Sequence, residues 1–430
     1  ILRGIDMNYT QLSKEELQQA LDEQNKVLAE IKKRKISLDI SRGKPCSEQL
    51  DITMAMLDMV NSSTQFPKPD YRNYGIVEGI PELRALFAKV LGVEKDETIV
   101  CGNSSLQLMY DTIQRNMQFG VCGGKPWNDG KIKFICPVPG YDRHFAICNH
   151  FGIEMINVPM TPAGPNMDLV ETLVAADESI KGIWCIPKYQ NPTGYTFSDE
   201  TVERLAKMNT AAKDFRIFWD NAYCVHDLYE QGDKLANIMA VAKEAGTADR
   251  IYEFASTSKI TFAGAGVAVI AASRNNIADI LSHMKFQTIG FNKVWQYAHY
   301  LYLQSPEHIA EIMAKQAAVI RPKFEKFEEV SSEEFGEGSG IAQWTKPRGG
   351  YFISLDVMGG CAREVGRLCK SAGLTITTVG DTFPYGVDDR DTNIRIAPTY
   401  ASEEDFAQAL QVLVCCIKVA CFTKLLEQKA

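Results

Sequence analysis

Short apolar runs alternate with segments of helical period along most of the chain. Between residues 98 and 272, runs such as 132–136, 183–186 and 217–219 are apolar at almost every position. Runs of this kind are typical of strands that are buried on both faces of a parallel sheet. The segments between them, such as 199–212, repeat apolar residues at helical spacing. This alternation predicts an α/β fold, with a mostly parallel sheet covered by helices on both faces.

The two ends of the chain follow a different pattern. Ser13 and Glu16 form a capping box that begins a helix, and the run 36–40 predicts a short strand. Ser305 and Pro306 predict the start of a long helix that reaches about residue 330. The spacing of the later elements indicates an α+β unit, with strands at 351–355, 374–377 and 393–397 and helices near 363–372 and 403–426.

These patterns divide the chain into three parts. A chain of 430 residues is too long for one typical core and suits one large and one smaller domain. We expect an N-terminal helix and arm at 1–50 that packs with the smaller domain. A large domain at 51–305 and a linking helix with the C-terminal small domain at 306–430 complete the expected organisation.

Composition narrows the class of protein. The net charge of −8, without a basic block, argues against a nucleic-acid binder. The longest apolar runs are strand-sized, which predicts no membrane span, and the N-terminus lacks the pattern of a signal peptide. The 12 cysteines contain no C-x-x-C pair and the 6 histidines have no ligand spacing, so we expect no metal. A cytoplasmic protein with reduced thiols is the expectation.

One lysine, Lys259, lies at a position that suits a chemical role better than a role in solubility. Ser256, Ser258 and Lys259 follow the strand-like run 251–255, and glycines follow the lysine. A lysine amine forms a Schiff base with a carbonyl once its pKa is lowered, and the hydroxyls beside it suit a phosphate. Together these groups suggest pyridoxal phosphate. A solvated lysine in a plain strand-loop-strand connection is the alternative on this stretch alone.

Other polar residues also follow predicted strands. Ligands of open α/β sheets bind at the carboxyl ends of the strands, so residues at these ends are expected to converge. An acid in such a place, as at Asp220, needs a cationic partner. The simpler interpretation of Ser104 and Ser105 is a plain helix cap, and that of Tyr141 is a half-buried surface residue. The residues in question are Ser104, Ser105, Tyr141, Asn191, Asp220 and the stretch 256–259.

Two positions outside the large domain suggest anion binding. Arg395 lies in an apolar strand and needs an anionic partner, which is either a substrate carboxylate or a structural acid. Gly43 lies between Arg42 and Lys44, in a loop that is either a solvated turn or an approach to a small anion.

The chain from about 41 to 395 resembles the pyridoxal-phosphate-dependent aminotransferases of fold type I, in the aspartate aminotransferase superfamily. The resemblance rests on Asn191-Pro192-Thr193-Gly194 and Ser256-x-x-Lys259, in order with Tyr74, Asp220, Tyr223 and Arg395. Within this superfamily it is most similar to a bacterial subgroup of class I aspartate aminotransferases. The resemblance implies a large cofactor-binding domain with a seven-stranded type of sheet, and a smaller α+β domain.

The resemblance also implies a role for each matched residue. Lys259 holds the cofactor as an internal aldimine and moves the proton, and Asp220 pairs with the pyridine nitrogen. Tyr74 reaches the phosphate of the neighbouring subunit, so a homodimer with shared active sites is expected. By the same resemblance, Asn191 and Tyr223 contact the 3′-oxygen of the cofactor, and Tyr141 stacks on its ring. The phosphate is bound by Ser104, Ser105 and Ser256, with Ser258 beside them. Arg395 binds the α-carboxylate of the substrate, and Gly43 and Asn191 also contact the substrate.

One segment departs from the family pattern. The family carries an arginine shortly after the lysine, in a pattern like Gly-x-Arg-x-Gly, as a phosphate ligand. This chain has Gly264-Ala265-Gly266-Val267-Ala268 there, with no arginine. The phosphate therefore needs another counter-charge or neutral donors.

The expected function is transamination between an L-amino acid and a 2-oxo acid by a ping-pong route, with aspartate and 2-oxoglutarate favoured. Alternatives are an aminotransferase for aromatic amino acids or kynurenine, and a lyase on the same scaffold. An effector-sensing domain of a transcription regulator is an alternative of another class. Acidic substrates need a second cation, for which the candidates are Arg42, Lys44, Arg143 and Arg348.

Overall fold

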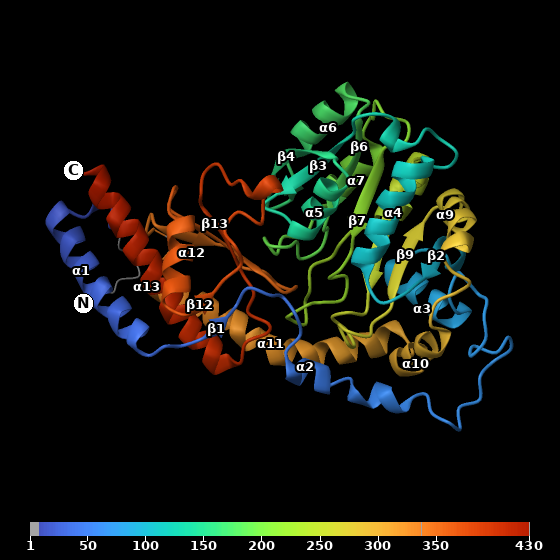
Figure 1. Ribbon diagram of the computed structural model, residues 1–430, viewed down its shortest axis with the longest axis horizontal. Helices are drawn as coiled ribbons and strands as arrows, with labels where there is room; N and C mark the ends of the chain where they lie inside the picture. The colour runs from blue at the N-terminus through green and yellow to red at the C-terminus, as the bar shows by residue number, and fades with distance from the viewer. Residues whose placement is uncertain (1–7, 337, 430) are drawn as a thin grey trace.

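A twisted sheet lies at the centre of the larger of two lobes in the computed structural model, which describes residues 8–336 and 338–429 (Figure 1). The start of the expected first part, residues 1–7, lies outside the described residues. The sheet confirms the predicted α/β class, because its inner strand pairs are parallel. Its order is β2 (Thr98–Val100), β9 (Ala268–Ala272), β8 (Ile251–Ser256), β7 (Arg216–Asp220), β6 (Ile180–Cys185), β3 (Lys133–Val138) and β4 (Glu154–Thr161), with the two-residue β5 (Gly164–Pro165) beyond β4.

Antiparallel pairs are confined to the two ends of this sheet. The strand β9 runs antiparallel to both β8 and β2, so β2 and β8 point in the same direction. At the other end, β5 is antiparallel to β4. The carboxyl ends of β2, β3, β6, β7 and β8 therefore meet at one edge of the sheet.

Helices cover both faces of the sheet, as the apolar runs predicted. Phe218 packs into the core under α4, α5 and α9, whereas its neighbours Ile217 and Trp219 pack into the core under α6, α7 and α8. Asp220 follows in the same alternation and shares the face of Phe218. The helices of this lobe are α3 (Pro81–Leu91), α4 (Ser105–Phe119), α5 (Asp142–His150), α6 (Met167–Ala176), α7 (Asp199–Lys207), α8 (Ile238–Ala245), α9 (Arg274–Gln287) and α10 (Lys293–Leu303).

The long helix α11 (Pro306–Glu334) runs from the larger lobe into the smaller one (Figure 1). The smaller lobe contains an antiparallel sheet of β10 (Ala342–Trp344), β11 (Ile353–Val357) and β13 (Asn393–Ile396), with α12 (Ala362–Ser371) and α13 (Glu403–Gln428). The N-terminal helix α1 (Lys14–Lys33) packs on α13, and β1 (Leu38–Asp39) pairs with β12 (Leu374–Thr375). The short α2 (Ser47–Asp51) then leads the chain along α11.

One helix corrects the expectation that all apolar runs are strand-sized. By length and composition α13 could cross a bilayer, and it is the one such helix among the described residues. Of its most apolar stretch, 78% is buried inside the protein. It contacts α1, α11 and α12, so apolar residues on all sides of it have partners.

Glu253 on β8 gives a prediction about stability. Its side chain is 3% exposed and accepts a hydrogen bond from Asn221 Nδ2 at 2.9 Å. Burial raises the pKa of this carboxyl from 4.5 to about 7. The folded protein thus holds the proton more tightly than the unfolded chain, and stability is lost as pH rises through this interval. We expect Glu253→Gln to gain up to about 3 kcal/mol relative to the wild type between pH 4.5 and pH 8.

Thermal unfolding of both proteins across this pH range checks the prediction. The exposed Glu244→Gln on α8 serves as the control and should show no pH-dependent difference from the wild type. A difference between Glu253→Gln and the wild type that stays constant with pH would show that the carboxyl does not titrate as described.

Candidate active site

A cavity of about 610 Å³ opens at the edge of the sheet where the parallel strands end, between the two lobes. Its walls come from both sides, because loops after β2, β3, β6, β7 and β8 face the loop 41–44 and residues of β13. Nearly all of the candidate site residues meet here. Those that line the cavity are Gly43, Ser104, Ser105, Tyr141, Asn191, Asp220, Tyr223, Ser256, Ser258, Lys259 and Arg395.

Lys259 lies on a tight loop between the antiparallel strands β8 and β9. Thr257 closes the loop, since its N–H donates to Val267 O at 2.9 Å and its hydroxyl accepts from Val267 N at 2.9 Å. Behind the loop, the ring of His299 on α10 lies 3.1 Å from the Thr257 hydroxyl. Trp295 on the same helix donates to Ala265 O. These contacts fix the backbone from which the Lys259 side chain enters the cavity.

The amine of Lys259 lies in an aromatic and weakly polar environment. Its Nζ is 5.0 Å from the ring centre of Tyr223 and 5.8 Å from that of Tyr351. Burial lowers the pKa of this lysine, while the negative charge of Asp220 acts in the opposite direction. Burial and the nearby lysine also lower the pKa of His226 to about 3, so this imidazole is uncharged at neutral pH. An amine in such a site loses its proton more easily than an exposed lysine.

Asp220 is held from one side only. Its Oδ2 lies 3.0 Å from Nε2 of His144 on α5, and both side chains are almost completely buried. The imidazole stacks on Trp184 of β6, with ring centres 4.3 Å apart and an angle of 9°. The other oxygen, Oδ1, is buried and has no hydrogen-bond partner among the described residues. A buried carboxylate oxygen without a partner is rare and indicates a missing cationic or N–H group.

Hydroxyl groups gather where α4 begins. Ser104 is the N-cap of α4, but its side chain makes no capping bond, so the hydroxyl is available to a ligand. Ser256 donates to Ser258 at 3.2 Å on the neighbouring loop. In the segment 264–268, which lacks the arginine of the family pattern, the N–H of Gly266 donates to Asn103 Oδ1 at 2.6 Å. The N-terminus of a helix with such hydroxyls is suited to an anion.

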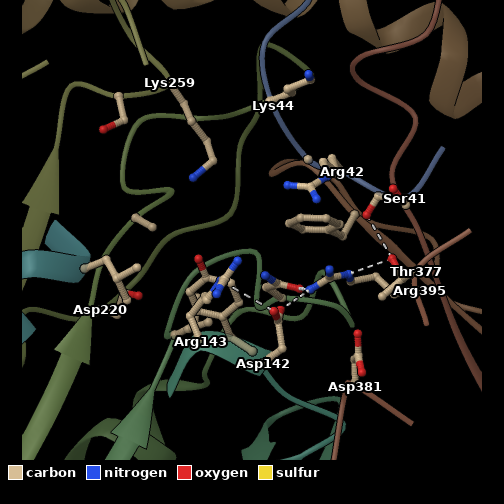
Figure 2. A pocket seen from close by; sticks show the side chains of 18 of the residues that line it. Ser41, Arg42, Lys44, Asp142, Arg143, Asp220, Lys259, Thr377, Asp381 and Arg395 are labelled. Atoms are coloured by element: carbon tan, nitrogen blue, oxygen red, sulfur yellow. Dashed lines mark hydrogen bonds and ion pairs between the residues drawn. The ribbon is translucent and has the colours of Figure 1, made fainter. Parts of the chain in front are cut away.

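Arg395 enters the cavity from β13 and is 8% exposed. Its Nη1 lies 2.9 Å from Asp142 Oδ1 and 3.3 Å from Asn191 Oδ1, and its Nε donates to Thr377 Oγ1 at 3.3 Å. Figure 2 shows these contacts across the cavity from Lys259. The structural acid expected for this arginine is therefore present as Asp142, and binding of a substrate carboxylate stays a prediction.

Two candidates lie away from the cavity. Tyr74 is 82% exposed and does not line it. Arg348 is also absent from its walls, since its Nη2 donates to Gln231 O at 2.5 Å and its Nε lies 3.4 Å from Asp233. The structure adds His144 and Asp142, which the sequence did not single out.

The comparisons with known proteins agree with this architecture. The sequence profile of the family described as "Aspartate amino-transferase" matches residues 12–429. A protein of Corynebacterium glutamicum named aspartate aminotransferase is 42% identical over 91% of this chain and 91% of its own length.

Solved structures give the same result. The crystal structure of an aspartate transaminase from Corynebacterium glutamicum superposes with a TM-score of 0.94 at 39% identity, covering 98% of this chain and all of that one. The α-aminoadipate aminotransferase LysN of Thermus thermophilus, solved with N-(5'-phosphopyridoxyl)-L-leucine, has a TM-score of 0.74 at 19% identity, over 91% of this chain and 93% of its own. The second similarity supports the fold alone.

Proposed function

The chain belongs to the aspartate aminotransferase family, and from this premise we propose that it transfers the amino group of L-aspartate to 2-oxoglutarate with pyridoxal phosphate as cofactor. The two substrates would occupy the same cavity in turn, which gives ping-pong kinetics. The observation that carries the proposal is the meeting of Lys259, Asp220 and Arg395 in one cavity, with an unpartnered buried oxygen on Asp220.

The residues present suit this cofactor. Bound pyridoxal phosphate supplies an aldehyde that condenses with amines and a protonated ring that accepts electrons. Asp220 would pair with the ring nitrogen through Oδ1, because that oxygen has no other partner among the described residues. Asn191 and Tyr223 would hold the ring oxygen, Tyr141 would stack on the ring, and Ser104, Ser105, Ser256 and Ser258 would hold the phosphate with neutral donors. The helix N-terminus of α4 would offset the missing arginine.

The protein's own groups divide the work of proton transfer. Lys259 Nζ, with its lowered pKa, would accept a proton from the substrate α-carbon and would deliver a proton to the cofactor's C4′ atom. Asp220 would act on the ring nitrogen, and His144, whose Nε2 lies 3.0 Å from its Oδ2, would hold the orientation of the carboxyl group. Arg395 would bind the α-carboxylate and so place the α-carbon within reach of the amine.

Arg395 gives a prediction that separates binding from chemistry. Arg395→Gln removes the cation for the α-carboxylate and leaves Asp142 without its partner at 2.9 Å. Losing the cation that would pair with the substrate α-carboxylate costs about 2–5 kcal/mol of binding, so kcat/KM should fall by roughly 30- to 5000-fold, mainly through KM. Steady-state kinetics with L-aspartate measure the loss, with the exposed Arg367→Gln as the control. An unchanged KM would mean that the carboxylate binds elsewhere.

A panel of amino donors tests the proposed reaction. Purified enzyme with pyridoxal phosphate and 2-oxoglutarate is assayed with L-aspartate, L-phenylalanine, L-kynurenine and L-alanine. The proposal requires L-aspartate to have the highest kcat/KM and to yield oxaloacetate. Preference for an aromatic donor would support the alternative aminotransferase, and release of ammonia without transfer would support a lyase.

We place the enzyme in the cytoplasm as a homodimer that binds neither nucleic acid nor membrane. Every one of the 12 cysteines is free, which suits a reducing compartment. Tyr74 is 82% exposed and Ile289 is 63% exposed, and a Cβ on Gly290 would lie 2.5 Å from Gly75 O, so the segments that carry them lie close together. An exposed apolar surface of this kind suits a subunit interface. A second subunit on this surface would bring Tyr74 toward the partner's phosphate.

A further inference from the structure

The carboxylate of Asp142 contacts Arg395 from the opposite lobe. Asp142 is the first residue of α5 in the larger lobe, and its Oδ1 lies 2.9 Å from Nη1 of Arg395 on β13 of the smaller lobe. Both side chains line the cavity, and that of Asp142 is 30% exposed. Figure 2 shows the pair in the cavity wall, with Arg143 beside it. The protein therefore supplies a carboxylate of its own to the guanidinium that would bind a substrate carboxylate.

The protein engages most of the N–H groups of Arg395. Its Nη1 also lies 3.3 Å from Asn191 Oδ1, and its Nε donates to Thr377 Oγ1 at 3.3 Å. Its Nη2 has no hydrogen bond or ion pair with any of residues 8–336 and 338–429. A carboxylate that accepts two parallel hydrogen bonds from a guanidinium needs Nη2 together with either Nη1 or Nε. An incoming carboxylate must therefore compete with a protein group for one of its two bonds.

Among these partners of Arg395, only Asp142 carries a charge. Its contact at 2.9 Å is also shorter than the two contacts at 3.3 Å. A second carboxylate on the same guanidinium would lie within roughly 5 Å of Asp142, and two like charges this close repel each other. Asp381 also lines the cavity, but burial raises its pKa, and it has no hydrogen bond or ion pair with Arg395. Asp142 is therefore the acid that acts directly on carboxylate binding at this arginine.

Bonds between the lobes hold Asp142 in this position. Two residues before it, Gly140 N donates to Thr382 O at 2.8 Å. On β4, Met155 N donates to the hydroxyl of Tyr385 at 3.1 Å. Both bonds join the larger lobe to the segment between β12 and β13 of the smaller one. The start of α5 is thus fixed against the smaller lobe, and the carboxylate stays beside the guanidinium.

We propose that Asp142 is a positioning residue that sets the affinity of Arg395 for the α-carboxylate of substrates and products. It holds the guanidinium in place and competes with the incoming carboxylate for the same N–H groups. This inference rests on the proposed function and deepens it. In a ping-pong reaction the first 2-oxo acid must leave before the second one binds, and a resident carboxylate on Arg395 favours that release.

Holoenzyme variants test this assignment, with propionate as the probe because it has one carboxylate and no amino group. Asp142→Asn keeps the shape and an oxygen acceptor but removes the charge. The KM for L-aspartate and the inhibition constant of propionate should therefore both fall roughly tenfold. Asp142→Ser should shift both constants in the same direction. Asp142→Glu keeps the charge and should show no such gain.

Asp168→Asn is the matched control. Asp168 also lies in the first turn of a helix and pairs with an arginine, Arg204, at 2.6 Å, but it lies outside the cavity walls. This variant should change neither constant. Thermal unfolding of each variant checks that it folds, and a damaged site would weaken binding, whereas the proposal requires tighter binding.

The outcomes separate this inference from the proposed function. Tighter propionate inhibition in Asp142→Asn, together with its loss in Arg395→Gln, supports the role of Asp142. If the wild type transaminates L-aspartate but Asp142→Asn binds propionate no better, the proposed function stands and the role of Asp142 is overturned. Retained propionate inhibition in Arg395→Gln would overturn that role as well, because the carboxylate would then bind elsewhere. If the wild type does not transaminate L-aspartate, the proposed function fails and the role of Asp142 falls with it.

Discussion

Replacement of Lys259 by alanine is expected to lower aminotransferase turnover by at least about 10⁴-fold. The side chain has two tasks, since its amine would attach the cofactor and also transfer the proton. No other lysine can replace it, because Lys44 is the one further lysine among the described residues that line the cavity and it belongs to the facing loop. Lys259→Arg should be equally inactive, since a guanidinium keeps the charge but cannot form the bond.

Stopped or continuous assays of oxaloacetate formation measure the loss of turnover. The mass of the borohydride-reduced protein shows whether the cofactor is covalently attached. The wild type should retain covalent cofactor and Lys259→Ala should not. Lys285→Ala, an exposed lysine on α9, is the control and should behave as the wild type. Retention of more than about a tenth of the activity in Lys259→Ala would assign the chemistry to another group.

Asp220→Asn is expected to reduce kcat by roughly 10²- to 10⁴-fold while the cofactor stays attached to Lys259. Asparagine has almost the same shape, so His144 keeps a partner at this position. What changes is the charge: an amide cannot stabilise a protonated ring nitrogen as a carboxylate does. The loss should therefore appear in turnover more than in KM.

The neighbouring strand provides a matched control for this variant. Glu253 is as deeply buried as Asp220, but it lies on β8 and bonds Asn221 outside the cavity walls. Glu253→Gln should keep kcat within about threefold of the wild type. Equal activity of Asp220→Asn and the wild type would remove Asp220 from the mechanism and would leave its unpartnered oxygen without an explanation.

The sequence was sufficient to predict the parallel sheet and most of the cavity walls, and the reason is geometric. Lys259 and Asp220 each follow an apolar run, and parallel strands bring their carboxyl ends to one edge. The α/β class and the family are confirmed. The individual roles of the residues remain predictions that the variants above address.

The contact of His144 with Asp220 could not be predicted in the same way. His144 is on α5 after β3, and Asp220 ends β7, with β6 between them in the sheet. Only the strand order shows that the imidazole reaches Asp220 across Trp184 of β6. The signal available in the sequence was weak. It consisted of His144, which comes three residues after Tyr141, the aromatic residue in the loop that follows β3.

The candidate second cations and α13 show two further limits. The sequence offered four cations as equal candidates for a second carboxylate site. Only the folded structure shows which acids and rings these cations contact, because it brings together residues far apart in the chain, such as Asp142 and Arg395. The apolar residues of α13 are interrupted by a charge at Lys418, which made the run look short. That lysine is 5% exposed and is paired with Glu334 at 2.6 Å, so its charge lies inside the protein with the apolar residues of the helix.

The absorbance spectrum of the purified protein tests the central claim most directly. After incubation with pyridoxal phosphate and removal of the excess, the protein should show a visible band that Lys259→Ala lacks. Addition of L-aspartate should abolish the band, and 2-oxoglutarate should restore it. A protein that remains colourless with pyridoxal phosphate, or a band that no amino acid changes, would contradict the account.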